Sequence, residues 1–86
     1  MQDFERRASK ELENSVLNYA RVIERANDGS YFAYVLDMPG CVACGKALEE
    51  VREEIRAALV LHIASLREHN EPVPPATSQV DTVRAA

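Results

Sequence analysis

Residues 31–45 read YFAYVLDMPGCVACG, and we expect the rest of the chain to be arranged around this segment. It begins with aromatic, β-branched and small residues, turns at Pro39-Gly40, and resumes as a second short apolar run. Proline presets φ for the second residue of a turn and glycine takes the positive φ that follows it, so residues 37–40 predict a tight turn. The segment therefore predicts two β-strands, 31–36 and 41–44, joined by that turn.

The sequence before this segment predicts an N-terminal arm and one partner strand. Residues 1–15 are strongly polar, with apolar residues at every fourth position: Phe4, Ala8 and Leu12. That thin stripe leaves a short docked helix and a disordered arm both open. Residues 16–25 are rich in β-formers, and the linker 26–30 contains Asn, Asp and Gly, which tolerate positive φ. We therefore expect an antiparallel hairpin, within one domain that covers residues 16–86.

A long amphipathic helix is predicted for residues 46–69. Its apolar positions recur at steps of three and four and form the stripe that should face the sheet: Leu48, Val51, Ile55, Leu59, His62 and Leu66. Glutamates in the first turn and an arginine in the last match the helix dipole. The proline-rich residues 71–75 cannot continue the helix. Residues 79–84 can pair as a last strand or fray. The pattern predicts a small α+β domain, an antiparallel sheet with the helix on one face.

Two apolar surfaces remain that this helix cannot cover. Both faces of the strand at residues 31–36 are apolar, so the face away from the helix also needs a cover. Its members are Phe32, Tyr34 and Leu36. The second half of the helix carries an apolar patch on the side away from the sheet: Ala57, Val60, Leu61 and Ala64. Contiguous exposed apolar surface usually marks a contact site. We therefore expect one surface to serve self-association and the other to bind a partner protein, without deciding which does which.

The length and the net charge of the chain restrict the kinds of molecule that it can bind. A chain of 86 residues forms one small domain with a marginal core, which favours a homodimer or higher oligomer. The formal net charge of -4 opposes nucleic-acid binding, which needs clustered Lys and Arg, and it favours a basic protein partner. The N-terminus is charged where a signal peptide is apolar, and no apolar run is long enough to span a bilayer. We expect a cytoplasmic protein with no membrane partner.

The two cysteines form a C-x-x-C motif at residues 41–44, a spacing that redox and zinc sites share. On a strand, residues three apart point to opposite faces with their Cα atoms about 10 Å apart, beyond disulfide reach. The two histidines that could complete a zinc site, His62 and His69, are separated by a rise of about 10.5 Å along the helix. We therefore expect structural cysteines, no metal and no cofactor.

Two alternatives to a protein-binding role stay open. A metal-dependent nuclease would need carboxylates that converge on its cations, and Glu24 and Asp37 are the candidates. Nothing in their spacing requires them to meet, and Asp37 is explained as a turn residue, so we expect no catalytic residue. An oligomeric RNA-binding module is the other alternative, which the acidic balance opposes.

A series of short motifs follows in order along residues 19–75: Ile23-Glu24, Gly29, Tyr31, Tyr34-Val35, Asp37-Met38-Pro39-Gly40-Cys41, Gly45, Glu49-Glu50 and Glu71-Pro72-Val73-Pro74. In this combination the chain resembles the N-terminal domain of the HicB-like antitoxin family. The resemblance implies a β-β-β-α-β domain of degraded RNase H-like type, which binds and neutralises a small HicA-type toxin that cleaves mRNA.

The sequence departs from the family pattern at three points. Many members carry a second, DNA-binding domain, but this sequence stops at Ala86, so we expect no DNA binding by this chain. Ala47 stands where the family places a Thr or Ser helix cap, and the loss of that cap should cost on the order of 1 kcal/mol. The arm at residues 1–15 has no counterpart in the family.

Overall fold

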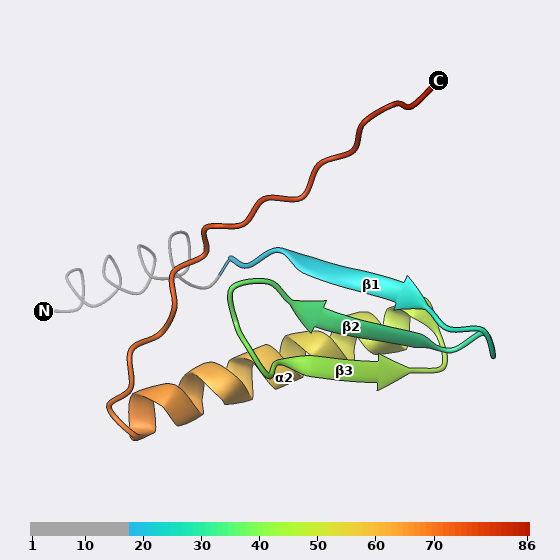
Figure 1. Cartoon of the computed structure of the whole chain (residues 1–86). Helices are drawn as coiled ribbons and strands as arrows, with labels where there is room; N and C mark the ends of the chain where they lie inside the picture. Colours follow the sequence, from blue (N-terminus) through green and yellow to red (C-terminus); the bar gives the residue numbers. More distant parts are fainter. Residues whose placement is uncertain (1–17) are drawn as a thin grey trace, which may run out of the picture.

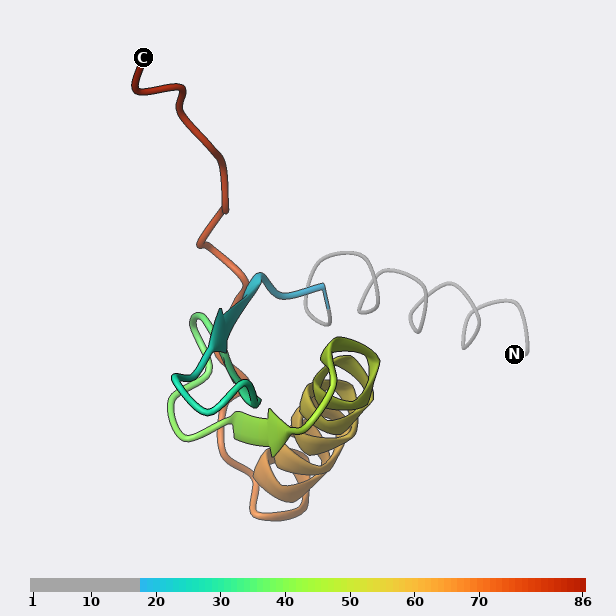
Figure 2. The same cartoon turned by 90° about the vertical axis from the view of Figure 1, so that its right-hand side faces the viewer.

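A computed structural model describes residues 18–86 of the chain. Three strands precede one long helix: β1 (Arg21–Arg25), β2 (Tyr31–Val35), β3 (Val42–Gly45) and α2 (Leu48–Glu68). The strands form an antiparallel sheet in the order β1-β2-β3, and α2 packs across one face of that sheet (Figures 1 and 2). The predicted α+β class, with the helix on one face, is confirmed.

Residues 79–84 form no strand in the structure, so the last strand in the β-β-β-α-β order that the family resemblance implied is wrong, and the other outcome left open for this segment holds. The C-terminal tail, residues 72–86, is attached to the domain at Thr77 and Ser78 and then leads away from the sheet (Figure 1). Residues 79–84 therefore do not lie beside an edge of the sheet. The predicted first strand is also too long, since β1 begins at Arg21. The predicted arm, residues 1–15, lies outside the described residues.

Each predicted turn is present and closed by backbone hydrogen bonds. In the β1–β2 hairpin, the Gly29 N–H donates to the Ala26 carbonyl at 3.0 Å, and Gly29 has a φ of 90°. In the β2–β3 connection, the Cys41 N–H donates to the Met38 carbonyl at 3.2 Å, and Gly40 takes the positive φ expected of it, 86°. Asp37 also adopts a positive φ, 66°, which the sequence pattern did not predict.

The core lies between the sheet and α2. Its buried residues come from β2, the following turn and the helix: Ala33, Val35, Met38, Cys41, Val51, Ile55 and Ile63. The predicted helix stripe is correct at its centre and wrong at one end. Leu48, the first residue of α2, is 37% exposed, whereas Ile63 was not assigned to the stripe and is buried. Ile63 lies two helical turns beyond Ile55, on the same face.

The start of α2 is fixed by contacts to the end of β3. Ala47 makes no side-chain cap, as expected from its sequence, but the Glu50 carboxylate accepts a hydrogen bond from the Lys46 N–H at 3.1 Å. A Cβ placed on Gly45 would lie 2.8 Å from the Val51 nitrogen, so β3 and α2 approach each other more closely than any side chain allows. No helix within residues 18–86 is long and apolar enough to cross a membrane.

Candidate protein-binding surfaces

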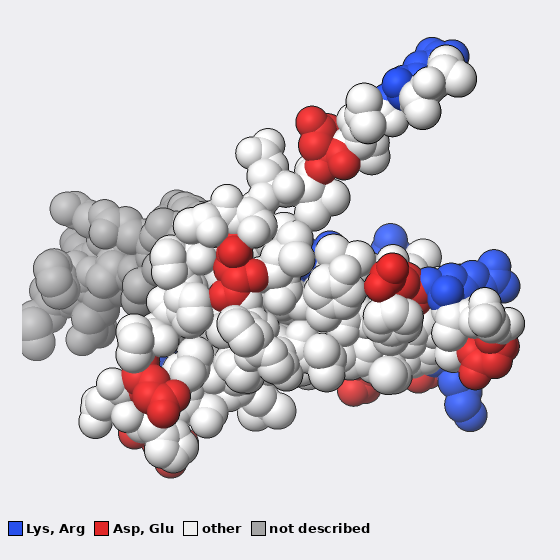
Figure 3. All heavy atoms as spheres, viewed as in Figure 1, with Lys and Arg blue, Asp and Glu red and all other residues white. Residues whose placement is uncertain are grey.

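The open sheet face is the side of the sheet that α2 does not cover. Strand pairing arranges its side chains in two rows across the three strands: Glu24–Phe32–Cys44 and Val22–Tyr34–Val42. Phe32 and Val42 are exposed, while Tyr34 and Leu36 are half-buried. In Figure 3 this face is mostly uncharged over the strands, with acidic and basic groups at its margins. The face is therefore an apolar platform with aromatic side chains at its centre.

Part of this platform was predicted from the sequence. Phe32 and Tyr34 were predicted and lie on it, and Leu36 follows the end of β2. Val22 and Val42 were missed, although Val42 is 65% exposed. The period-two alternation of the outer strands could have indicated them, but the strand register that aligns both with Tyr34 could not be read from the sequence.

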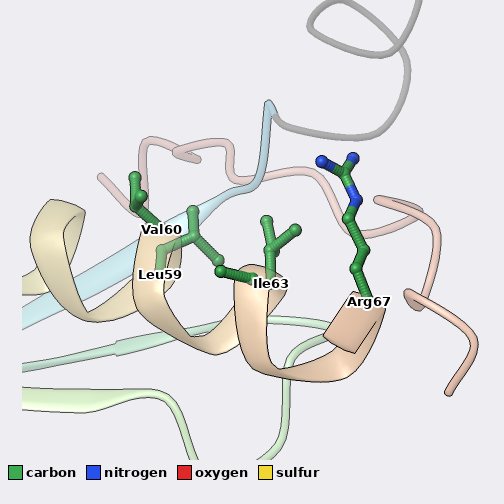
Figure 4. A pocket seen from close by; sticks show the side chains of 5 residues that line it. Leu59, Val60, Ile63 and Arg67 are labelled. Carbon is green, nitrogen blue, oxygen red and sulfur yellow. The ribbon is translucent and has the colours of Figure 1, made fainter. Parts of the chain in front are cut away.

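The outer helix patch consists of the four predicted residues of α2: Ala57, Val60, Leu61 and Ala64. All four are exposed, and Leu61 is 70% exposed. Beside them lies a shallow groove of about 210 Å³, lined by Leu59, Val60, Ile63, Ala64 and Arg67. Figure 4 shows Leu59, Val60, Ile63 and Arg67 projecting from one side of the helix. The patch and the groove share Val60 and Ala64, so they form one apolar surface with a basic side chain at its end.

The first half of α2 has the opposite character. Its exposed side chains are mainly acidic: Glu49, Glu50, Glu53 and Glu54. Among the described residues, one ion pair offsets them, between Arg52 and Glu49 at 2.6 Å, and exposed pairs of this kind contribute little to stability. Negative charge at the N-terminal end of a helix is favourable. The helix thus presents an acidic half followed by an apolar half.

Asp37 attaches the C-terminal tail to the sheet. Its carboxylate accepts hydrogen bonds from the N–H groups of Thr77 and Ser78, at 2.9 and 2.6 Å, and from both hydroxyls. These bonds, led by those from Ser78, hold the pKa of Asp37 below its usual value. Nearby, the Tyr19 hydroxyl donates to the Pro74 carbonyl, and burial, with the Asp37 charge as the next cause, raises the pKa of Tyr19. We call these bonds between Asp37 and the tail the tail latch.

The two cysteines occupy different environments. Cys41 is buried in the core and Cys44 is exposed on the open sheet face, and both are free thiols. Burial raises the pKa of the Cys41 thiol. The strand geometry therefore separates the cysteines of the C-x-x-C motif, as predicted. Within residues 18–86, no three His, Cys, Asp or Glu side chains come together in a way that could hold a metal ion.

The structure does not bring together the two carboxylates of the nuclease alternative. Glu24 pairs with Phe32, and Asp37 follows the far end of β2, five residues beyond Phe32 along the chain. The extended part of that path, from Phe32 to Val35, already spans about 10 Å along the sheet. Asp37 is also occupied by the tail latch. These residues cannot share a pair of metal ions.

Comparison with known proteins gives a consistent result. Residues 19–86 match the family model described as HicB-like antitoxin of bacterial toxin-antitoxin system. A UPF0150 protein of Thermoplasma acidophilum is 35% identical over 69 residues, which is 80% of this chain and 100% of that protein. A UPF0150 protein of Synechocystis is 36% identical over 69% of this chain and 75% of its own length. An uncharacterised 14.9 kDa protein of Haemophilus phage HP1 is 38% identical over 65% of this chain and 41% of its own length.

Proposed function

Because the chain belongs to the HicB-like antitoxin family of bacterial toxin-antitoxin systems, we propose that it binds and neutralises a small basic toxin of the HicA type, which cleaves mRNA. It acts in the cytoplasm, as a binding protein without chemistry of its own. The observation that supports this proposal best is the outer side of α2, where exposed carboxylates lead directly into an exposed apolar patch.

The outer side of α2 fits a basic protein better than the open sheet face does. Glu53 and Glu54 are exposed, and their charge attracts Lys or Arg side chains of a partner, which raises the rate of encounter. The adjoining Val60 and Leu61 supply apolar surface, and burying one such side chain contributes about 1.5–3 kcal/mol. An interface that combines an apolar centre with charged neighbours has the composition typical of a specific complex.

The open sheet face is assigned to self-association. Its centre carries no charge that would favour a basic partner (Figure 3), and its exposed Phe32 and Val42 suit a second copy of the same neutral surface. A small domain with a thin core gains stability when such a face is covered. The chain is therefore proposed to be a homodimer or higher oligomer.

Two matched variants test this assignment, because Leu61 and Val42 are almost equally exposed, 70% and 65%, on different surfaces. Leu61→Glu should weaken binding to a HicA-type toxin by about tenfold or more, measured by titration calorimetry, and leave the sedimentation mass unchanged. Val42→Glu should lower the sedimentation mass and leave toxin affinity unchanged. If Leu61→Glu changes neither the toxin affinity nor the sedimentation mass, the proposal is overturned. If Leu61→Glu lowers the sedimentation mass and Val42→Glu lowers the toxin affinity, the assignment of the two surfaces is wrong.

A direct assay separates neutralisation from catalysis. Purified chain should protect an RNA substrate from the toxin in proportion to the amount added, and should leave the RNA intact when magnesium or manganese is supplied without toxin. Cleavage by the chain alone, abolished by Glu24→Gln, would support the nuclease alternative instead.

A further inference from the structure

The end of the C-terminal tail has the sequence of a strand but no strand neighbour within residues 18–86. Residues 79–84 read QVDTVR, with polar and β-branched residues mixed, and every residue of this segment is exposed. Val83 is 91% exposed. The Thr82 N–H donates to the Asp81 carboxylate and the Arg84 side chain donates to the Ala86 carbonyl, so both bonds stay within the end of the tail. This part of the tail leads away from the sheet in both views (Figures 1 and 2). Apolar side chains and backbone groups are both left without cover.

β1 offers a matching edge. Within the described sheet it has a neighbour on one side only, β2. Ala20 accepts a hydrogen bond from Leu36, and Ala26 donates one to Ser30. Since bonded pairs alternate along an antiparallel ladder, the even-numbered residues of β1 bond to β2, and Arg21, Ile23 and Arg25 point their N–H and C=O groups outward. Such an edge is a template for another strand.

The charges of the two segments select one alignment. If the tail runs parallel to β1 with Asp81 beside Arg21, then Arg84 falls beside Glu24. The same alignment places Val83 beside Ile23, which packs against the core. Opposite charges and apolar side chains on neighbouring strands stabilise pairing. The sequence thus favours a parallel register that joins the tail to a β1 edge.

We propose that residues 79–84 of the tail pair with β1 of a second copy of this chain, while that copy returns its own tail to the first. Within residues 18–86 each chain has one unpaired strand segment and two edge strands, β1 and β3, and the charge pattern of the tail matches β1, so a reciprocal exchange about a two-fold axis satisfies the tail and the β1 edge of both copies. The tail's own β1 is the less suitable neighbour because the tail latch directs residues 79–86 away from it (Figure 1). The exchange rests on the self-association part of the proposed function and is independent of the toxin.

Charge reversal tests the register. Glu24→Arg and Arg84→Glu should each weaken the dimer by about two- to fivefold, the range for one cross-strand charge pair, and the double variant should restore it. Glu54→Arg is the matched control, because it makes the same charge change at an exposed position of α2 and should leave the dimer unchanged. Sedimentation velocity over a concentration series gives the dissociation constants. Single variants without effect, or a double variant without restoration, overturn this register.

An equimolar mixture of isotope-labelled and unlabelled full-length chain tests the exchange itself. Isotope-filtered NMR should show contacts between Val83 of one copy and Ile23 of the other. Contacts found within one copy only, or no contact between these residues, overturn the exchange. The chain could dimerise, and Val42→Glu could dissociate the dimer, without any contact between Val83 and Ile23. That result would support the interface through the open sheet face and would overturn the strand exchange. A chain that stays monomeric at all concentrations overturns both.

Discussion

Replacing Gly45 by alanine should destabilise the domain because the new methyl group would overlap the backbone of α2. The added Cβ would lie 2.8 Å from the Val51 nitrogen and 3.1 Å from its Cα and Cβ. Val51 is fully buried, and its N–H donates to the Ala47 carbonyl at 3.0 Å. The first turn of the helix must therefore move as a unit, unlike the flexible end of a side chain. Overpacking of this kind costs about 1–3 kcal/mol.

Urea unfolding followed by far-ultraviolet circular dichroism measures this loss. In a domain of this size each 1 kcal/mol lowers Tm by about 4–8 °C, so thermal unfolding gives a second estimate. Gly29→Ala is the control: nothing lies within 4 Å of its added Cβ, and its φ is 90°, so it reports backbone strain without a clash. If Gly45→Ala lowers the free energy of unfolding by less than about 0.5 kcal/mol, as ordinary surface changes do, the close packing of β3 on α2 is refuted.

Three further outcomes follow from burial and hydrogen bonding. Ile63→Ala should lower the free energy of unfolding by about 2–4 kcal/mol, and Leu48→Ala by less than about 1 kcal/mol, in urea titrations; equal losses would contradict the core described above. Cys44 should react with a thiol reagent in the native protein, whereas Cys41 should react only on unfolding; simultaneous reaction of both would count against the burial of Cys41. The pKa of Asp37 is lower in the folded state than its usual value, so tail attachment is fully present above the usual carboxyl pKa. That attachment should be lost as pH falls through the folded pKa, and NMR shifts of the tail that do not change with pH would contradict the latch.

Local patterns predicted most of the fold. The Pro39-Gly40 pair set the turn after β2, because these residues supply the required φ values regardless of the rest of the chain. The spacing of apolar residues at steps of three and four predicted the helix at residues 46–69. The observed α2 starts two residues later and ends one residue earlier. The opposite orientation of Cys41 and Cys44 follows from the period of a strand alone.

Features set by contacts between distant residues could not be predicted in this way. Ile63 joins the core because of where α2 crosses the sheet, and helical periodicity alone leaves its neighbour His62 an equally good candidate. The bonds that Asp37 accepts from Thr77 depend on a tail 40 residues away. The absence of a strand at residues 79–84 has the same origin, since the latch sets the direction of the tail.

The candidate surfaces could be predicted because the sequence has more apolar faces than one helix can cover. One helix covers one face of a sheet, so one of the two apolar faces of β2 had to stay open, and it is the face of Phe32 and Tyr34. Leu61 stood out because it falls opposite the core stripe of α2. The contributions of Val22 and Val42 depend on strand register, which a short strand without a polar face specifies weakly.

The tail latch also sets the order in which the molecule can assemble. Its hydrogen bonds join residues 40 and 41 positions apart, whereas the β1–β2 hairpin closes over a few residues and β3 leads directly into α2. Closing a long loop costs more entropy than closing a short one and gains little until its anchor is in place. The sheet and helix should therefore be complete before the tail is held, during synthesis as well as in refolding. Both surfaces proposed for partners would be available on a chain whose last residues are still free.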